Sequence, residues 1–293
     1  MTDQPRKLLD ILNLCTQYLS DHQIENARLN AELILGHVLH FPRVQLYVNF
    51  EKPLSDDELQ RIREALRRRA AHEPIQYILG ETEFYGLPFK LNSKTLIPRP
   101  ETELLVEQTC TLVSPDVSAT ILDVGTGSGI IAISLAKELP NSNFVAIDIN
   151  PDSLELSEAN ARLNGVHARI NFKQIDILSD QADTLQPAFD VIVSNPPYIT
   201  TEDMRILPPE IKNHEPESAL HGGEDGLRFY QRLAELSQHL LKSDGYVCVE
   251  IGYKMADSIR RIFTSSGLTI IATYADLNKI ERVIIAQRID KRG

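Results

Sequence analysis

Asp123-Val124-Gly125-Thr126-Gly127-Ser128-Gly129, which we call the glycine loop, lies between a predicted strand at residues 119–124 and a predicted helix at residues 130–139. Glycines at such a position let the backbone turn tightly and approach a ligand. In an open α/β fold this loop lies at the carboxyl edge of a parallel sheet, where such folds bind ligands. The spacing is G-x-G-x-G, which differs from the G-x-G-x-x-G of dinucleotide-binding loops.

The residues after the glycine loop alternate between strand and helix patterns. Asn150 is suited to cap a helix with Pro151 as its first residue, and Asn164-Gly165 is suited to end that helix. Further strands are expected at residues 143–148, 170–175, 189–194, 246–251, 268–274 and 282–287. This alternation predicts the α/β fold class, with a doubly wound, mostly parallel sheet of seven strands.

The residues before this domain have a helical pattern. Apolar side chains recur at helical spacing over residues 6–80. Ser55 and Glu58 form a capping box, so a helix is expected to begin there and to run into the arginines at residues 67–69. Two roles stay open for these arginines. They complement the dipole at the helix C-terminus, or they form a contact surface for an acidic partner or RNA.

The segment 83–91 has a different character from both flanking regions. Its aromatic residues surround the sequence Gly86-Leu87-Pro88, which predicts a hairpin with a Gly-x-Pro turn. The sequence thus divides into a small all-α N-terminal domain at residues 1–82, a linking β-hairpin at residues 83–98 and an α/β domain at residues 99–293.

The charge of the chain is distributed unevenly between these regions. The whole sequence has 30 Lys and Arg against 41 Asp and Glu, a net charge of −11. Residues 1–98 have 13 acidic and 12 basic residues, so nearly all of the negative charge lies in the α/β domain. Binding of bare nucleic acid needs a basic surface to neutralise phosphates, so we expect no stable complex of that kind.

The cysteines and the apolar runs indicate the compartment. Cys15, Cys110 and Cys248 are scattered, with no C-x-x-C pair and no even framework, which favours a reducing compartment. No run approaches the ~18 apolar residues of a membrane span. We expect a cytoplasmic monomer that binds no membrane. No H-E-x-x-H motif or paired Cys/His spacing suggests a metal.

Asp148 ends the predicted strand that follows the glycine loop, about 20 residues further along the chain. A carboxylate there can accept hydrogen bonds from ribose hydroxyls. Together the two features resemble the class I methyltransferases, which use S-adenosyl-L-methionine as cofactor and have a Rossmann-like sheet. The resemblance implies that Gly125 to Gly129 lie against the methionine part and that Asp148 holds the ribose. It further implies that Asp176 accepts from the adenine amine and that Ile177 packs on the adenine ring.

Asn195-Pro196-Pro197-Tyr198, which we call the acceptor loop, directly follows the predicted strand at residues 189–194. Consecutive prolines cannot continue a strand, so they hold a rigid loop with its carbonyls turned outward. The Asn195 side-chain oxygen and the Pro196 carbonyl can both accept from one –NH₂ group, and Tyr198 offers a flat face to a planar substrate. This arrangement suits methylation of an amide or aryl amine by positioning and electrostatics. We therefore expect Asn195, Pro196 and Tyr198 to be catalytic, the whole loop to bind substrate, and Asn195 to border the cofactor as well.

Three further segments indicate which class of substrate is methylated. They are Leu96-Ile97-Pro98-Arg99-Pro100-Glu101-Thr102-Glu103, residues 215–227 (EPESALHGGEDGL) and Glu250-Ile251-Gly252-Tyr253. With the helical N-terminal domain, they resemble the peptide release factor glutamine methyltransferase family (PrmC, also called HemK). The resemblance implies methylation of the glutamine side-chain amide in the Gly-Gly-Gln motif of class 1 translation release factors. It implies that the N-terminal domain helps to hold the release factor.

The same resemblance leaves two local questions open. Residues 99–102 either line the cofactor side or begin a helix, with Pro100 in its first turn and Glu101 favourable to its dipole. Lys279 stands where the family usually has glycine, and some relatives have an aromatic residue at the position of Ile177.

Two other functions compete with this interpretation. An adenine or rRNA base methyltransferase shares the Asn-Pro-Pro-Tyr sequence, but the acidic α/β domain and the absence of a basic target-recognition domain speak against it. A non-catalytic cofactor-binding module would have no need of the acceptor loop.

Overall fold

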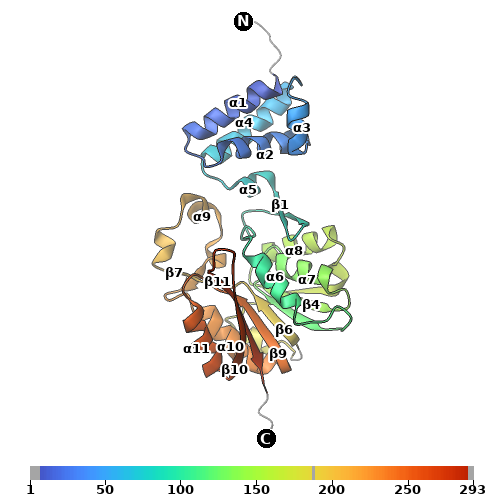
Figure 1. The fold of residues 1–293 in the computed structure, drawn as a ribbon, viewed down its shortest axis with the longest axis vertical. Coiled ribbons are helices and arrows are strands. Elements are labelled where there is room, and N and C mark those ends of the chain that lie inside the picture. The colour runs from blue at the N-terminus through green and yellow to red at the C-terminus, as the bar shows by residue number, and fades with distance from the viewer. Residues whose placement is uncertain (1–6, 187–188, 290–293) are drawn as a thin grey trace. The chain divides into compact units, whose positions relative to one another are not determined.

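The computed structural model describes residues 7–186 and 189–289 (Figure 1). The chain forms two compact units. The first is Met1–Gly80 together with Pro209–His214, and the second is Glu81–Pro208 together with Glu215–Gly293.

The first unit is helical, as the sequence predicts. Its helices are α1 (Leu8–Asp21), α2 (Ala27–Leu39), α3 (Arg43–Val48), α4 (Asp56–Ala70), α5 (Ile75–Leu79) and the later segment α9 (Pro209–His214). Helices α1, α2 and α4 enclose a core of buried aliphatic side chains, among them Leu12, Ile34 and Ile62. The predicted capping box is confirmed, because Ser55 accepts from the Glu58 backbone N–H and the Glu58 carboxylate accepts from the Ser55 N–H.

Two arginines of the predicted run bind within this unit. Arg68 donates to both carboxylate oxygens of Glu73, at 2.6 and 2.8 Å. Arg69 is only 5% exposed, and it donates to Asn30 Oδ1 at 2.8 Å, to the Glu73 carbonyl at 3.0 Å and to Glu210 Oε1 of α9 at 2.7 Å. Arg69 is thus committed to internal contacts and is not available as a contact surface.

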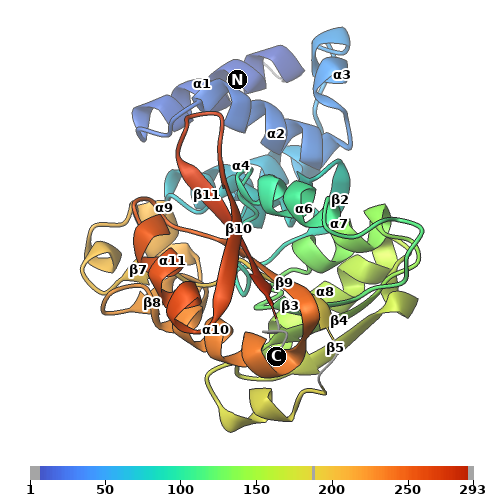
Figure 2. The same ribbon diagram turned by 60° about the horizontal axis from the view of Figure 1, so that its bottom comes forward.

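A seven-stranded sheet forms the centre of the second unit, in the order β10-β11-β9-β6-β3-β4-β5 (Figures 1 and 2). The strands are β3 (Thr120–Val124), β4 (Asn143–Asp148), β5 (Ile170–Gln174), β6 (Phe189–Ser194), β9 (Leu241–Glu250), β10 (Leu268–Ala275) and β11 (Glu281–Arg288). All neighbours pair in parallel except β11, which is antiparallel to both β9 and β10. The predicted α/β fold class is confirmed.

Helices cover both faces of this sheet (Figure 2). Alternate strand residues divide between two cores: Ile121 and Val191 point to one face, and Leu122 and Ile192 to the other. Three helices cover the first face: α6 (Thr102–Cys110), α7 (Ile130–Glu138) and α8 (Pro151–Leu163). Two cover the second: α10 (Arg228–Leu240) and α11 (Ala256–Ser265). A sheet buried on both faces explains why its central strands are continuous apolar runs.

The predicted hairpin consists of β1 (Glu81–Phe84) and β2 (Leu87–Lys90). Its turn lies at Tyr85 and Gly86, which both have positive φ, so the predicted Gly-x-Pro turn was wrong in detail and Pro88 lies within β2. Phe84 and Phe89 bury their rings in the core of the second unit. Asn160 of α8 binds both the N–H and the carbonyl of Lys90.

The compact units differ from the predicted domain boundaries in two places. The hairpin belongs to the second unit, because its aromatic side chains are buried there, and α9 belongs to the first, where Glu210 binds Arg69. Two short strands after the acceptor loop, β7 (Ile199–Thr200) and β8 (His221–Gly223), form a separate parallel pair with no counterpart among the predicted strands.

Lys279 lies in the turn between β10 and β11 with φ of +62°. Glycine adopts this backbone conformation without steric cost, which accounts for the glycine usual at this position in the family that the sequence resembles. The substitution is therefore confined to a turn.

The described helices include none that is both long enough and apolar enough to cross a lipid bilayer.

Candidate active site

A cavity of about 590 Å³ opens at the carboxyl edge of the parallel strands in the second unit. Its walls include Gly125 after β3, Asp148 at the end of β4, Asp176 after β5 and Asn195 after β6. The volume is within the usual range of small-molecule sites, about 300–1,000 Å³. Four loops that are separate in the sequence thus meet at one cavity.

The glycine loop contributes backbone to this cavity. Gly125 and Gly127 line it, and both have positive φ. The other three predicted loop residues do not line the cavity. Thr126 is buried and donates to Asp123 Oδ2 at 2.7 Å, Ser128 is buried, and a Cβ atom at Gly129 would lie 2.6 Å from Ser157 Oγ of α8. These three residues pack against the protein interior and support the loop on the side away from the cavity.

Asp123 anchors the glycine loop from within the sheet. Its side chain is fully buried, and Oδ2 accepts from both Thr126 Oγ1 and the Ala132 N–H. Burial raises the pKa of this carboxyl to about 7.

Asp148 is held in a fixed orientation at the cavity wall. Its Oδ2 accepts from the Gly127 N–H and its Oδ1 from the Asn150 N–H, each at 2.9 Å. Burial raises the pKa of this carboxyl above its usual value, while the backbone donors oppose the shift. Each oxygen keeps a further lone pair, so the side chain can accept from a pair of neighbouring hydroxyls. Ile149 beside it is 53% exposed and lines the cavity, which the sequence analysis missed.

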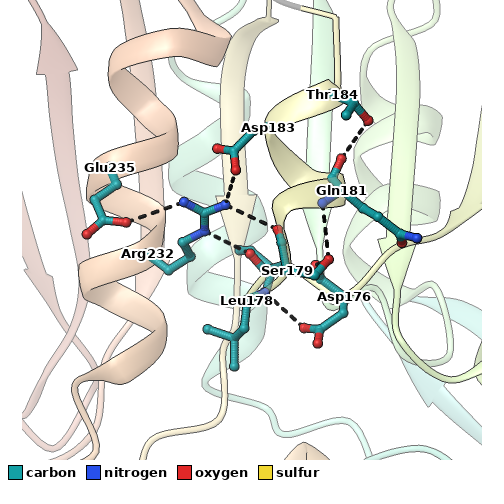
Figure 3. Close-up of polar contacts among 9 residues, drawn as sticks. Asp176, Leu178, Ser179, Gln181, Asp183, Thr184, Arg232 and Glu235 are labelled. Atoms are coloured by element: carbon teal, nitrogen blue, oxygen red, sulfur yellow. Dashed lines mark hydrogen bonds and ion pairs between the residues drawn. The ribbon is translucent and has the colours of Figure 1, made fainter.

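The segment after β5 forms another part of the wall, and Figure 3 shows how it is held. Asp176 Oδ1 accepts from the Leu178 N–H at 2.9 Å. Arg232 of α10 donates to the Ile177 carbonyl at 2.9 Å, to the Ser179 carbonyl at 3.2 Å and to Asp183 Oδ2 at 2.8 Å. One guanidinium therefore fixes the backbone that carries Asp176 and Ile177. The role of Arg232 had no signal in the sequence, because Ile177, Ser179 and Asp183 lie 49 to 55 positions away.

The acceptor loop contributes Asn195, Pro196 and Pro197 to the cavity. Asn195 Nδ2 donates to Thr102 Oγ1 at 3.1 Å. Immediately before it, Ser194 Oγ donates to the Val124 carbonyl at 2.8 Å, which joins the acceptor loop to the strand that precedes the glycine loop.

Tyr198 does not line the cavity. Its ring is close to Gly252, where a Cβ atom would lie 2.9 Å from Tyr198 Cδ2, and its carbonyl is in contact with Gly226. Burial raises the pKa of this phenol to about 12. Gly222, Gly226 and Gly252 of the family-like segments thus leave room for Tyr198.

Residues 99–102 also lie outside the cavity lining. The helix α6 begins at Thr102 with Glu101 as its N-cap residue, so a helix does start at this segment, but Pro100 lies before it and not in its first turn. Arg99 forms an ion pair with the buried carboxylate of Glu215 at 2.6 Å. The lining comes instead from two neighbouring segments, Lys94 to Leu96 and Glu217 to Ala219, and from His221, Arg228 and Phe229. Leu96, Glu217 to Ala219 and His221 lie within the two family-like segments 96–103 and 215–227, and the other lining residues flank those segments.

The cavity suits the parts of S-adenosylmethionine. Asp148 offers fixed acceptors to a ribose, and Asp176 with the aliphatic side chains of Ile149 and Ile177 offers an acceptor and apolar walls to an adenine. Gly125 and Gly127 expose backbone with no side chain in the way of an amino-acid moiety. Among the described residues, no three His, Cys, Asp or Glu side chains gather as metal ligands would.

Known proteins resemble both parts of the chain. Residues 10–80 match the family described as PrmC N-terminal domain, and residues 100–208 match the family described as methyltransferase small domain. The chain is 40% identical to the release factor glutamine methyltransferase of Geobacter sulfurreducens over 286 residues, covering 97% of this chain and 98% of that protein. It is also 40% identical to the enzyme of the same name from Chlorobaculum tepidum, covering 94% and 95%.

Solved structures share the fold at low sequence identity. A methyltransferase from Pyrococcus furiosus superposes with a TM-score of 0.53 at 18% identity, covering 71% of this chain and 91% of that one. The catalytic domain of hMettl16 gives a TM-score of 0.57 at 16% identity, covering 80% and 83%. These likenesses support the methyltransferase fold alone.

We expect Asp148→Ala to weaken S-adenosylmethionine binding by about 10- to 100-fold, since hydrogen bonds to a charged group contribute about 1.5–3 kcal/mol each. Calorimetric titration measures the affinity. Glu155→Ala, which removes an exposed carboxylate from α8, is the control and should bind like the wild type. Unchanged affinity in Asp148→Ala would remove this residue from the site.

Arg232→Met should raise the dissociation constant for S-adenosylmethionine by about 10-fold, because the backbone at Ile177 and Ser179 loses its donor. Glu235→Gln is the matched control. It removes only the charge of Glu235, whose carboxylate lies 3.4 Å from Arg232, and leaves the three other bonds of Arg232 intact. Equal affinities of the two variants in the same titration would contradict the role assigned to Arg232.

Proposed function

This chain belongs to the release factor glutamine methyltransferase family, and from that premise we propose that its acceptor loop holds the glutamine while Asp148 and Asp176 hold the cofactor. The protein transfers a methyl group from S-adenosylmethionine to the side-chain amide nitrogen of a glutamine in a translation release factor. The proposed substrate is the Gly-Gly-Gln motif of class 1 release factors, as the sequence resemblance implies.

The chemistry asks the protein mainly for positioning. When bound, S-adenosylmethionine supplies a methyl group attached to a positively charged sulfur. A nucleophile in line with the carbon–sulfur bond can bond to this methyl group while the bond breaks and the neutral sulfur leaves. A carboxamide nitrogen is a weak nucleophile because its lone pair is delocalised over the amide. Two fixed acceptors on its N–H groups orient that nitrogen and stabilise the positive charge that develops on it. The methylated nitrogen then loses its proton readily, so no strong base is required.

One observation carries this proposal. Asn195 Nδ2 is engaged by Thr102, so the Oδ1 end of the amide is left for a ligand, and the same residue lines the cavity that contains Asp148 and Asp176. The Pro196 carbonyl follows directly in a loop that cannot donate N–H bonds at its two prolines. A glutamine amide placed between these two acceptors lies next to the cofactor cavity.

We assign Tyr198 a supporting part in this site. Its ring packs near Gly252 and restrains the acceptor loop, so its effect on the substrate passes through the position of Asn195 and Pro196. This differs from the flat stacking face that the sequence suggested.

The proposed partners follow from the same premise. The helical unit would help to hold the release factor, and the acidic second unit suits a protein substrate better than bare nucleic acid. We also propose that the protein acts as a monomer in the cytoplasm. The free state of all three cysteines supports a reducing compartment, and burial raises the pKa of the Cys15 and Cys248 thiols to about 12.

Transfer of labelled methyl groups tests the function directly. The purified protein should label a class 1 release factor that has an intact Gly-Gly-Gln motif, and should fail to label the same factor with Ala in place of that glutamine. DNA and rRNA are offered in parallel. Label on nucleic acid, or on the Ala variant of the factor, would overturn the proposed substrate.

Asn195→Ala should lower kcat by ~10²-fold or more, comparable to the loss of one transition-state contact, while the affinity for S-adenosylmethionine changes little. Steady-state methylation and calorimetric titration provide the two measurements. Asn171→Ala removes an exposed asparagine from β5, away from the cavity, and serves as the control. Normal turnover in Asn195→Ala would exclude the proposed role of this amide.

A further inference from the structure

We infer that Glu250 and Thr102 are positioning residues that fix the Asn195 side-chain amide with its carbonyl oxygen toward the cavity. The inference rests on the proposed function, in which that oxygen accepts from the substrate –NH₂ group. It gives a role to the Thr102 and Glu250 side chains, which lie in the family-like segments 96–103 and 250–253.

The three residues come from distant parts of the chain and form one chain of hydrogen bonds. Thr102 is the first residue of α6, Asn195 directly follows β6, and Glu250 is the last residue of β9. Asn195 Nδ2 donates to Thr102 Oγ1 at 3.1 Å, and Thr102 Oγ1 donates to Glu250 Oε2 at 2.6 Å. Thr102 is 0% exposed and Glu250 is 2% exposed, so water has little access to replace either partner.

The direction of these bonds follows from counting protons. A threonine hydroxyl has one proton and two lone pairs, while an ionised carboxylate can only accept. The Thr102 proton therefore goes to Glu250, and the hydroxyl has only lone pairs left for Asn195. Of the two ends of the Asn195 amide, only the –NH₂ end can bind a lone pair, so this end must face Thr102.

The opposite end of the amide is then the acceptor that the reaction needs. No described residue donates to Asn195 Oδ1, and Asn195 lines the cavity. With the amide turned over, its –NH₂ group would face the –NH₂ group of the substrate, and two donors cannot bind each other. A carboxylate that does not itself line the cavity thus selects which end of Asn195 the substrate meets.

The surroundings of Glu250 determine the pH at which its carboxyl is ionised and can fix the orientation of the Asn195 amide. Burial raises the pKa of its carboxyl to about 7, and Glu101 adds to the shift, while Thr102, Arg282 of β11 and Asn195 oppose it. Two phenols are close as well: Tyr198 of the acceptor loop, and Tyr230 of α10, which donates to the Glu250 carbonyl at 2.8 Å. Once protonated, the carboxyl is itself a donor, and Thr102 can then offer its proton to Asn195. Turnover that needs the ionised form is present above about pH 7 and is lost as the pH falls through that value.

Substitutions in α6 test the inference with a matched pair. Thr102→Val removes the hydroxyl and keeps the shape, so kcat should fall on the order of tenfold or more, with little change in S-adenosylmethionine affinity. Thr102→Ser keeps the hydroxyl and should recover most of the turnover. Thr109→Val makes the same change at a buried threonine of the same helix, whose hydroxyl donates to the Leu105 carbonyl, and should turn over like the wild type.

Glu250→Gln gives a second, independent readout. A glutamine does not titrate, so the fall in kcat that the titration of Glu250 should cause in the wild type between about pH 8 and about pH 6 should be absent from this variant. The side-chain ¹⁵N resonance of Asn195, observed without substrate, should shift with pH in the wild type and stay constant in Glu250→Gln. This readout also decides the matter if Thr102→Val does not fold, as thermal unfolding would reveal.

The outcomes distinguish failure of the proposed function from failure of the role assigned to Thr102 and Glu250. A wild-type protein that fails to methylate the release factor overturns the proposed function, and with it this inference. A wild-type protein that methylates the factor overturns the inference alone if Thr102→Val matches Thr109→Val in kcat. The inference is also overturned if the side-chain ¹⁵N resonance of Asn195 shifts with pH in Glu250→Gln as it does in the wild type.

Discussion

The register of the parallel strands is the constraint on which the site depends. Val124 at the end of β3 pairs with Ile147 of β4 and with Ser194 of β6. The residues that come next, Gly125, Asp148 and Asn195, therefore lie at the same level and at the same edge of the sheet. A shift of one residue in any strand would turn its side chains to the opposite face and move these groups apart. The buried faces of the sheet oppose such a shift, because both are filled with apolar side chains.

Buried carboxyl groups organise the loops that leave this edge. Asp123 is the residue before the last in β3 and holds the glycine loop through Thr126. Glu250 is the last residue of β9 and reaches the acceptor loop through Thr102. Burial raises the pKa of each to about 7. Burying such groups is unfavourable unless they are hydrogen-bonded, and the same low-dielectric surroundings strengthen the bonds they make. In both cases a threonine hydroxyl joins the carboxyl to the loop, which gives each loop a fixed direction at the cavity.

Much of the fold could be predicted from local sequence patterns. The strands at residues 143–148 and 189–194 have the predicted bounds, and the capping box at Ser55 and Glu58 forms as expected. These features depend on nearest neighbours and on apolar runs, which are visible in the sequence. The hairpin turn begins at Tyr85, one position before the predicted turn at Gly86. It was misplaced because Tyr85 adopts a positive φ, which is uncommon for tyrosine and cannot be predicted from the residue type. The pair β7 and β8 was missed because strands of two and three residues have no periodicity to detect.

The sequence by itself determined the order of strands and helices, the glycine and acceptor loops and the family, because each depends on residues adjacent in the chain. Only the tertiary structure decided which residues support the site. Arg69 ends a helix in the sequence, but its charge binds Glu210, 141 positions away. Thr102 begins a helix, but its hydroxyl lies between Asn195 and Glu250, 93 and 148 positions away. Such contacts arise when the sheet is paired and its faces are covered, since only then do distant polar groups lose water and require one another as partners.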